Sequence, residues 1–317
     1  MGTELFADFL WANAQAGLAI LAVLALRRPV RRLFGAQTAY ALWAAVPLVL
    51  LAGMVPAAEA ERGTAMAAHA VAPALRLHPP QALIWIWAAG LVMAAGLMAL
   101  GQMRFLARAR RGQAGPAVVG VITPRLVTPA DFQTTYTDAE RALIRAHERA
   151  HIERDDPKAN ALVALAQCLC WFNPLVHAAA YAVRLDQELA CDATVMATRS
   201  RQRRLYAQTM LKTQLSGTPL PLGCHWLAGA HPLEARIAAL ARPPLADARL
   251  QAGAWGATVL VAMAAYGVWA AKPPAPPRTH FEQAALDSAR TALPGQGIVM
   301  IHLSALEVAS LPQPRVR

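Results

Sequence analysis

The sequence predicts a mainly α-helical protein with several membrane spans and one small β-hairpin. Hydrophobic residues make up 56% of its 317 residues, charged residues make up only 15%, and the mean hydropathy is +0.32. In ordinary soluble domains about a quarter of the residues are charged, so this composition favours a membrane protein. Four apolar runs are long enough to cross a bilayer. They are Phe9–Leu26, Ala39–Val55, Ala82–Gly101 and Ala252–Ala271.

The positions of the arginines predict the orientation of these spans. Arginines cluster directly after the first and the third run, whereas the 57–80 segment has two arginines offset by two glutamates. Because positive loops stay in the cytoplasm, we expect both termini outside and residues 102–251 inside. The same bias accounts for the net charge of +11, and no basic recognition element for nucleic acid is present. The first run does not resemble a signal peptide, because Glu4 and Asp8 precede it.

These observations divide the chain into four parts. Residues 1–101 should hold three transmembrane helices with short loops, and residues 102–251 should form a cytoplasmic domain. Residues 252–271 should be a fourth transmembrane helix, followed by a proline-rich linker and a short outer tail at 272–317. A further apolar stretch, Ala159–Val183, is divided by Asn173-Pro174 into pieces too short to cross a bilayer, so two packed helices are expected there.

The cytoplasmic part contains the motif His147-Glu148-Arg149-Ala150-His151, which reads H-E-x-x-H. Thr137 and Glu140 fit a capping box that would begin a helix before it. Pro157 should end that helix and open the next, with Asp156 as its N-cap. On a helix, residues four apart share one face, which suits two nitrogen ligands of one Zn²⁺, with Glu148 placed to deprotonate a water. The alternative is a surface helix with incidental histidines.

A third ligand is available further along the chain. Glu188 and Asp192 lie one turn apart on another predicted helix. Glu188 is the candidate third zinc ligand, and Asp192 is expected to accept the second ring N–H of a ligand histidine, His147 being the leading candidate. A fourth position would then stay open for water, as in catalytic zinc sites. A solvated helix charge is the ordinary alternative for Glu188.

Two short β-rich runs, Ala117–Val121 and Leu126–Thr128, flank Pro124 and predict a hairpin just before the motif. An edge strand beside a zinc site can hold a peptide by strand addition. A purely structural hairpin is equally compatible with the pattern.

Taken together, these segments resemble a known family. Over roughly residues 1–270 the chain is similar to the BlaR/MecR group of membrane-embedded gluzincin metallopeptidases. The similarity lies in the motif helix, in Trp171-Phe172-Asn173-Pro174, in the Glu188–Asp192 segment and in the hairpin region. These are antirepressor and sensor-transducer proteins. Separately, His231–Ile237 is similar to the H-P-x-x-x-R-I element of HtpX-type membrane proteases. The resemblance therefore implies a helical, gluzincin-like zinc peptidase domain in a bacterial-type inner membrane.

The resemblance also implies a function. A zinc endopeptidase on the cytoplasmic side would cleave a regulatory protein, which the resemblance suggests is a transcriptional repressor. The bilayer and a separate sensor protein are the further partners considered. Glu148 would take a proton from the water and pass it to the leaving amine, and His231 is the candidate donor for the oxyanion, with Arg236 as a weaker one. The sequence departs from the β-lactam sensors of the family, because no lysine follows a serine with S-x-x-K spacing.

Two other functions compete with this interpretation. One is an inactive zinc-binding membrane scaffold or signal relay, against which the intact Glu148 counts. The other is a transporter-like protein with an incidental motif, but the predicted spans carry almost none of the polar residues that transporters use.

Overall fold

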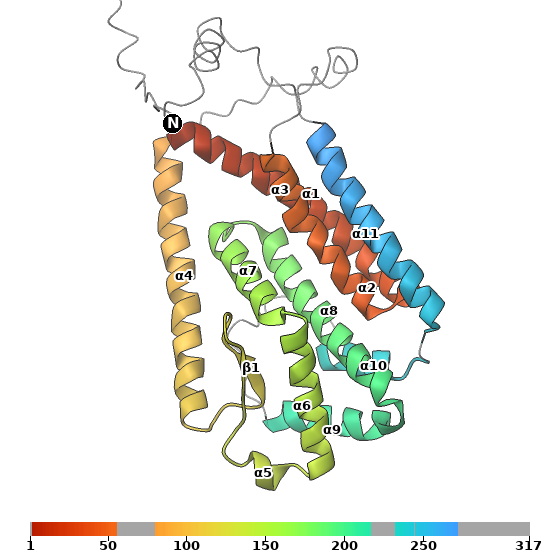
Figure 1. Ribbon diagram of the computed structural model, residues 1–317. Helices are drawn as coiled ribbons and strands as arrows, with labels where there is room; N and C mark the ends of the chain where they lie inside the picture. Colours follow the sequence, from red (N-terminus) through yellow and green to blue (C-terminus); the bar gives the residue numbers. More distant parts are fainter. Residues whose placement is uncertain (1, 56–79, 217–231, 244, 272–317) are drawn as a thin grey trace, which may run out of the picture. The chain divides into compact units, whose positions relative to one another are not determined.

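The computed structural model describes residues 2–55, 80–216, 232–243 and 245–271. Nearly all of this part is helical, and one two-stranded sheet interrupts the helices (Figure 1). The elements, in chain order, are α1 (Gly2–Phe34), α2 (Ala36–Ala41), η1 (Leu42–Ala44), α3 (Ala45–Met54), α4 (Gln81–Arg110), β1 (Ala117–Val119), β2 (Arg125–Val127), α5 (Phe132–Thr135), α6 (Asp138–Glu153), α7 (Asp156–Leu169), α8 (Pro174–Thr198), η3 (Ser200–Gln202), α9 (Arg203–Ser216), α10 (Pro232–Leu240) and α11 (Asp247–Ala270).

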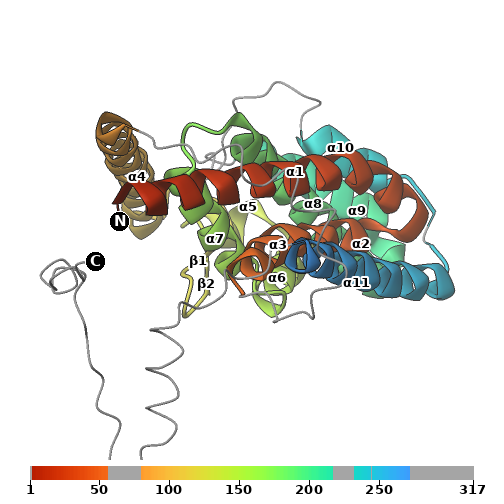
Figure 2. The ribbon, with the colours of Figure 1, turned by 90° about the horizontal axis from the view of Figure 1, so that it is seen from above.

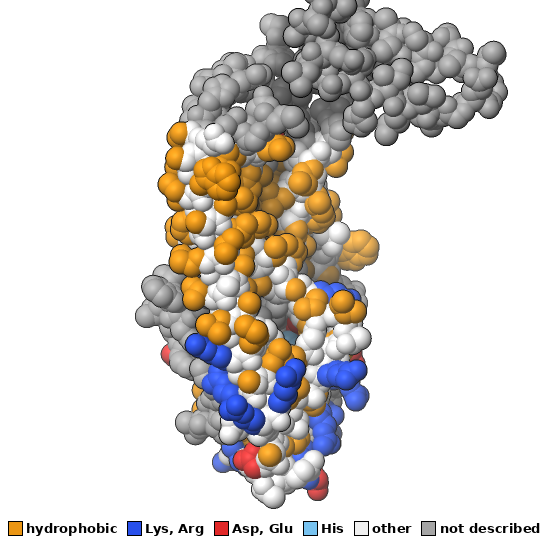
Figure 3. Space-filling model, turned by 90° about the vertical axis from the view of Figure 1, so that its left-hand side faces the viewer, with side chains coloured by type: hydrophobic (Ala, Val, Ile, Leu, Met, Phe, Trp, Pro, Cys, Tyr) orange, Lys and Arg blue, Asp and Glu red, His pale blue; other side chains and the backbone are white. Residues whose placement is uncertain are grey.

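Four helical stretches in the described part are long and apolar enough to cross a membrane: Leu5–Phe34, Ala36–Met54, Gln81–Arg110 and Asp247–Ala270. Each contains one of the four predicted runs, except that the second and fourth runs extend one residue beyond the end of the helix. Their outward faces carry exposed apolar side chains, as lipid contact requires. Figure 3 shows this on the side of α4, where hydrophobic side chains cover one part of the surface and Lys and Arg gather beyond it.

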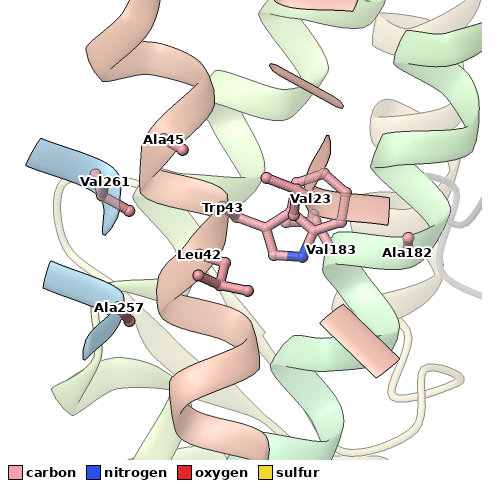
Figure 4. Close-up of a cluster of buried hydrophobic side chains, with 8 residues drawn as sticks. All are labelled: Val23, Leu42, Trp43, Ala45, Ala182, Val183, Ala257 and Val261. Atoms are coloured by element: carbon pink, nitrogen blue, oxygen red, sulfur yellow. The ribbon is translucent and has the colours of Figure 1, made fainter. Parts of the chain in front are cut away.

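Helices α1, α2, α3 and α11 pack together, and α8 packs against α1 and α2 (Figures 1 and 2). Gly35, with φ of 93°, makes the sharp turn from α1 to α2 that this packing needs. The shared core contains Leu42 and Trp43 from the segment between α2 and α3, together with Val183 of α8 (Figure 4). Helix α8 thereby connects the membrane helices to the remaining helices.

A buried polar cluster fixes α1 to α8. The Asp186 carboxylate, which has no exposed side-chain surface, accepts hydrogen bonds from Arg27 Nε at 2.6 Å and Nη2 at 2.9 Å. Arg31 donates to it at 3.0 Å and the Trp43 indole at 2.9 Å. Four donors compensate the desolvation of one carboxylate, as a buried charge requires.

The stretch Ala159–Val183 forms two packed helices, α7 and α8, as predicted. Asn173 ends the connection by accepting a hydrogen bond from the Leu175 N–H at 2.9 Å, and Pro174 takes the first helical position. The prediction for the start of α7 was wrong by one residue. Asp155, with φ of 58°, is the N-cap, and Asp156 is already helical. The shift has a consequence, because it leaves the Asp156 carboxylate free to contact α6.

The predicted hairpin is present. Strands β1 and β2 pair antiparallel, with Ala117 opposite Val127 and Val119 opposite Arg125. The strands are slightly shorter than the predicted runs, because Gly120, with φ of 104°, begins the turn. Beside the hairpin, Phe105 near the end of α4 is buried against Ala114 and Ala117.

The other end of α4 is held by two tryptophans. The Trp87 indole donates to the Leu169 carbonyl at 2.8 Å, and the Trp171 indole donates to the Trp87 carbonyl at 3.2 Å. The Trp171 ring lies directly on Gly90, where a Cβ would be 2.1 Å from a ring carbon. Between these two attachments α4 stands away from α2, α3 and α11 (Figures 1 and 2).

Candidate metal centre

The candidate site begins on α6. Its first turn is closed by the predicted capping box: the Glu140 N–H donates to Thr137 Oγ1 at 3.3 Å, and the Thr137 N–H donates to Glu140 Oε2 at 2.8 Å. Helix α6 then places His147 and His151 on one face, one turn apart. Both rings are largely buried, with exposed side-chain fractions of 12% and 13%.

Three candidate ligand side chains meet at this face. His147 Nε2 and His151 Nε2 are 3.0 Å apart, and the oxygens of Glu188 on α8 lie 3.3 Å and 3.5 Å from them. Two ligands of a tetrahedral zinc with bonds near 2.05 Å are about 3.3 Å apart. The three predicted ligands therefore lie close enough together to share one ion.

The outer ring nitrogens of the histidines explain why a cation suits this site. His147 Nδ1 contacts the Tyr206 hydroxyl at 2.8 Å and an Asp192 oxygen at 3.4 Å. His151 Nδ1 lies 2.7 Å from an Asp156 oxygen. Both Nδ1 atoms thus face acceptors, which leaves the two Nε2 atoms, 3.0 Å apart, turned toward one shared ligand position.

Asp192 lies beside His147, as predicted, and the Tyr206 hydroxyl, which the sequence did not predict, bridges the two side chains. Tyr206 of α9 donates its hydroxyl to Asp192 Oδ1 at 2.6 Å and contacts His147 with the same oxygen. Asp192 thus supports His147 both through Tyr206 and at 3.4 Å directly.

Asp156 supports the other histidine, a role that the sequence did not reveal. Its carboxylate is 1% exposed and also accepts hydrogen bonds from Tyr40 Oη at 3.1 Å and Cys191 Sγ at 3.4 Å. Tyr40 belongs to α2, within a candidate membrane span. A chain of contacts therefore runs from a membrane helix to the ring of His151.

Arg236 of α10 joins the two carboxylates of α8. Its Nε and Nη2 donate to the two oxygens of Asp192 at 2.8 Å and 2.7 Å, and Nη1 lies 2.8 Å from Glu188. The guanidinium is thus placed to orient Glu188, and the weaker oxyanion role considered from the sequence stays a prediction. His231, the predicted oxyanion donor, lies outside the residues that the structure describes.

The charges of the site follow from these contacts. Burial raises the pKa of Asp192, but the Arg236 charge and hydrogen bonds outweigh it and hold this pKa at about 2. The same balance holds the pKa of Glu188 well below its usual range. Burial alone would lower the pKa of His147, yet the two carboxylates raise it to about 10. Both carboxylates therefore stay ionised at neutral pH, and they favour a positive charge on or beside the His147 ring.

A cavity of about 930 Å³ opens onto these groups. His147, Glu148 and His151 line one side of it, so the predicted general base faces the same space as the predicted ligands. A space of this size, mostly apolar and with a few convergent polar groups, is typical of a substrate site.

Comparison with known proteins supports this interpretation of the site. The family described as BlaR1 peptidase M56 matches residues 7–89 and 111–240. The chain belongs to this family. The match includes the motif on α6, the Glu188 region, α2, α3 and most of α1, and it ends before α11. Members of the family are metallopeptidases, and metallopeptidase chemistry agrees with the donor set found here.

Curated relatives match over a shorter region. The chain is 32% identical over 98 residues to the regulatory protein BlaR1 of Bacillus licheniformis, an overlap of 31% of this chain and 16% of that protein. It is 28% identical over 101 residues to the methicillin resistance mecR1 protein of Staphylococcus aureus, an overlap of 32% and 17%. The chain thus covers less than a fifth of either relative. No solved structure matches it.

Proposed function

We propose that this membrane protein is a zinc-dependent endopeptidase that cleaves a cytoplasmic regulatory protein, repressor-like in character, during signal transduction. The observation that carries the proposal is the convergence of three ligand-type atoms beside Glu148 on the wall of one cavity. Relatives named as regulatory and resistance proteins support the regulatory part of the proposal.

The residues of this chain divide the work. His147, His151 and Glu188 would hold the metal, while Asp192, Tyr206 and Asp156 fix the orientation of the two rings. Zinc bound there supplies Lewis acidity, which lowers the pKa of a water and polarises a carbonyl. The Glu148 carboxylate accepts the proton of that water and returns it to the leaving amine. His231 remains our candidate for stabilising the oxyanion.

The proposed orientation places this chemistry on the cytoplasmic side of a bacterial-type inner membrane, with both termini outside. Arginines at the ends of α1 and α4 support it. Cysteine probes in residues 57–80 and 278–317 should react with an impermeant reagent from outside, and probes in 105–135 only after permeabilisation. Labelling of 105–135 and 278–317 from the same side would contradict the four-span arrangement.

Glu148→Gln tests the chemistry directly. It removes the general base and keeps every proposed ligand, so it should retain about one zinc per chain and abolish cleavage. His147→Ala and Glu188→Ala should lose the zinc. The readouts are metal content in detergent and a comparison of cytosolic fragments between cells with wild type and with Glu148→Gln. Identical fragments in an activated pathway would favour a zinc-binding scaffold or signal relay, and full zinc in both alanine variants would refute the ligand assignment.

A further inference from the structure

The cavity beside the candidate metal centre extends well beyond the polar groups. One wall is the inner face of α4, on which Ala95, Met98, Ala99 and Gln102 recur at helical spacing. The opposite wall is α7, with Ala161, Ala164, Leu165 and Cys168. We call the space between these two helices the α4–α7 chamber. Met98 Sδ and Cys168 Sγ approach to 3.9 Å at one end of it.

In the proposed orientation the chamber would extend into the bilayer. Ala95 lies nine residues before Arg104, the first charged residue of α4, which corresponds to about 14 Å along a helix. Half the hydrocarbon thickness of a bilayer is about 15 Å. If Arg104 lies at the cytoplasmic surface, the α4 wall therefore extends from that surface almost to the bilayer midplane.

Several apolar side chains of both walls are exposed. Leu165 is 54% exposed although it faces the chamber, and small alanines elsewhere on both walls leave the space wide. Phe105 closes the side of the chamber toward the hairpin, where residues 115–121 continue its lining to the motif histidines. The apolar space and the candidate metal centre are thus parts of one cavity.

We propose that the α4–α7 chamber binds an apolar segment of the polypeptide substrate on one side of the scissile bond. This inference rests on the proposed peptidase function and specifies its substrate class: a chain whose residues beside the cleavage site are large and aliphatic. Continuity with the candidate metal centre favours a peptide, because a segment held there leaves the adjoining peptide bond beside Glu148. Burial of its side chains against the two walls supplies the affinity.

Binding can be measured without cleavage in the zinc-loaded Glu148→Gln protein in detergent. The probes are two fluorescein-labelled peptides of equal length, one with leucines and one with serines beside a common central sequence, and the readout is anisotropy. The leucine peptide should bind at least about tenfold more tightly, the discrimination typical of an apolar pocket. Ala99→Phe on α4 and Ala164→Phe on α7, added to this protein, should remove most of that preference by filling the chamber.

Each filling variant has a matched control on the same helix. Leu97 and Leu162 are 65% and 53% exposed and do not line the cavity, so Leu97→Phe and Leu162→Phe should keep the tenfold preference. Zinc content and the unfolding midpoint identify any variant that has lost its fold. If only one filling variant folds, comparing its leucine-peptide preference with that of the control on the same helix is still a sufficient test.

Two results would overturn the inference. One is an equal affinity for both peptides, or a preference that the filling variants leave unchanged. The other is a phospholipid that copurifies with wild type, is lost on filling and is not displaced by the leucine peptide, which would make the chamber a lipid site. Because cleavage plays no part in the measurement, failure here is distinguishable from failure of the peptidase proposal, which the Glu148→Gln comparison of fragments tests.

Discussion

Replacement of Asp192 by asparagine should weaken both the fold and the metal centre. The carboxylate is almost fully buried and accepts hydrogen bonds from Arg236 Nε at 2.8 Å, Arg236 Nη2 at 2.7 Å and the Tyr206 hydroxyl at 2.6 Å. An asparagine has the same shape but offers one oxygen and directs an NH₂ group at one of these donors. The variant therefore leaves Arg236 buried without its bidentate partner.

The size of the effect follows from these contacts. Removing one member of a buried ion pair costs about 3–5 kcal/mol. Arg236 keeps its contact with Glu188 at 2.8 Å, so we expect a cost near the lower end, about 3 kcal/mol. The zinc affinity should fall by about 10–100-fold, because His147 loses the carboxylate behind its Nδ1 atom. Tyr206→Phe should cost less, about 1 kcal/mol of stability, since the Asp192–Arg236 pair survives.

The assay has two parts. Unfolding in detergent without zinc gives the stability of wild type, Asp192→Asn and Tyr206→Phe, and competition with a chromophoric chelator gives their zinc affinities. The expected order for both quantities is wild type, then Tyr206→Phe, then Asp192→Asn. A zinc affinity of Asp192→Asn within twofold of wild type would show that Asp192 does not support the metal ligand, and an unchanged unfolding midpoint would refute the ion-pair argument.

Two further predictions concern the helices around the site. Gly90→Ala should destabilise the protein by about 1–3 kcal/mol, because the new Cβ displaces the Trp171 ring. Gly96→Ala, whose new Cβ would have nothing within 4 Å, should be neutral or slightly stabilising. Thermal unfolding of both variants in detergent tests this, and equal unfolding midpoints would contradict the prediction. Burial tends to raise the pKa of Glu140, but its hydrogen bond to the backbone N–H of Thr137 and its contacts with Lys212 lower it below 4.5 in the folded protein. The ionised carboxylate therefore stabilises the folded state fully above pH 4.5, and this stabilisation is lost as the pH falls through the folded-state pKa. The difference in unfolding free energy between wild type and Glu140→Gln should therefore shrink as the pH falls below 4.5. A difference that grows over this range would contradict the lowered pKa.

The parts of the fold that could be predicted depend on local patterns. The capping box of α6 lies within four residues, and the hairpin within about a dozen, so short-range chemistry was sufficient for both. The membrane spans follow from composition over about 20 residues. The start of α7 was misplaced by one residue because either Asp155 or Asp156 can cap a helix before proline. The decision depends on His151, which draws the Asp156 carboxylate toward α6.

The candidate site was only half visible in the sequence. Spacing alone indicates His147, Glu148 and His151, and their role as ligands and base stays a prediction. Tyr206 could not be found in this way, because it reaches His147 only through the packing of α9 on α6, 59 residues later in the chain. The contact of Tyr40 with Asp156 spans 116 residues and carries no local signature at all. Supporting contacts of this kind are set by tertiary packing, which periodicity does not encode.

The buried contact between Arg27 and Asp186 has a consequence for biogenesis. The two residues are 159 positions apart, so α1 is synthesised long before the carboxylate that neutralises its arginine. Until α8 emerges and docks, Arg27 must remain at the water-exposed edge of the bilayer, since a lone guanidinium inside it is costly. Final seating of α1 is therefore a late step of assembly. A chain that stops before α8 should leave α1 displaced toward the side on which Arg27 meets water.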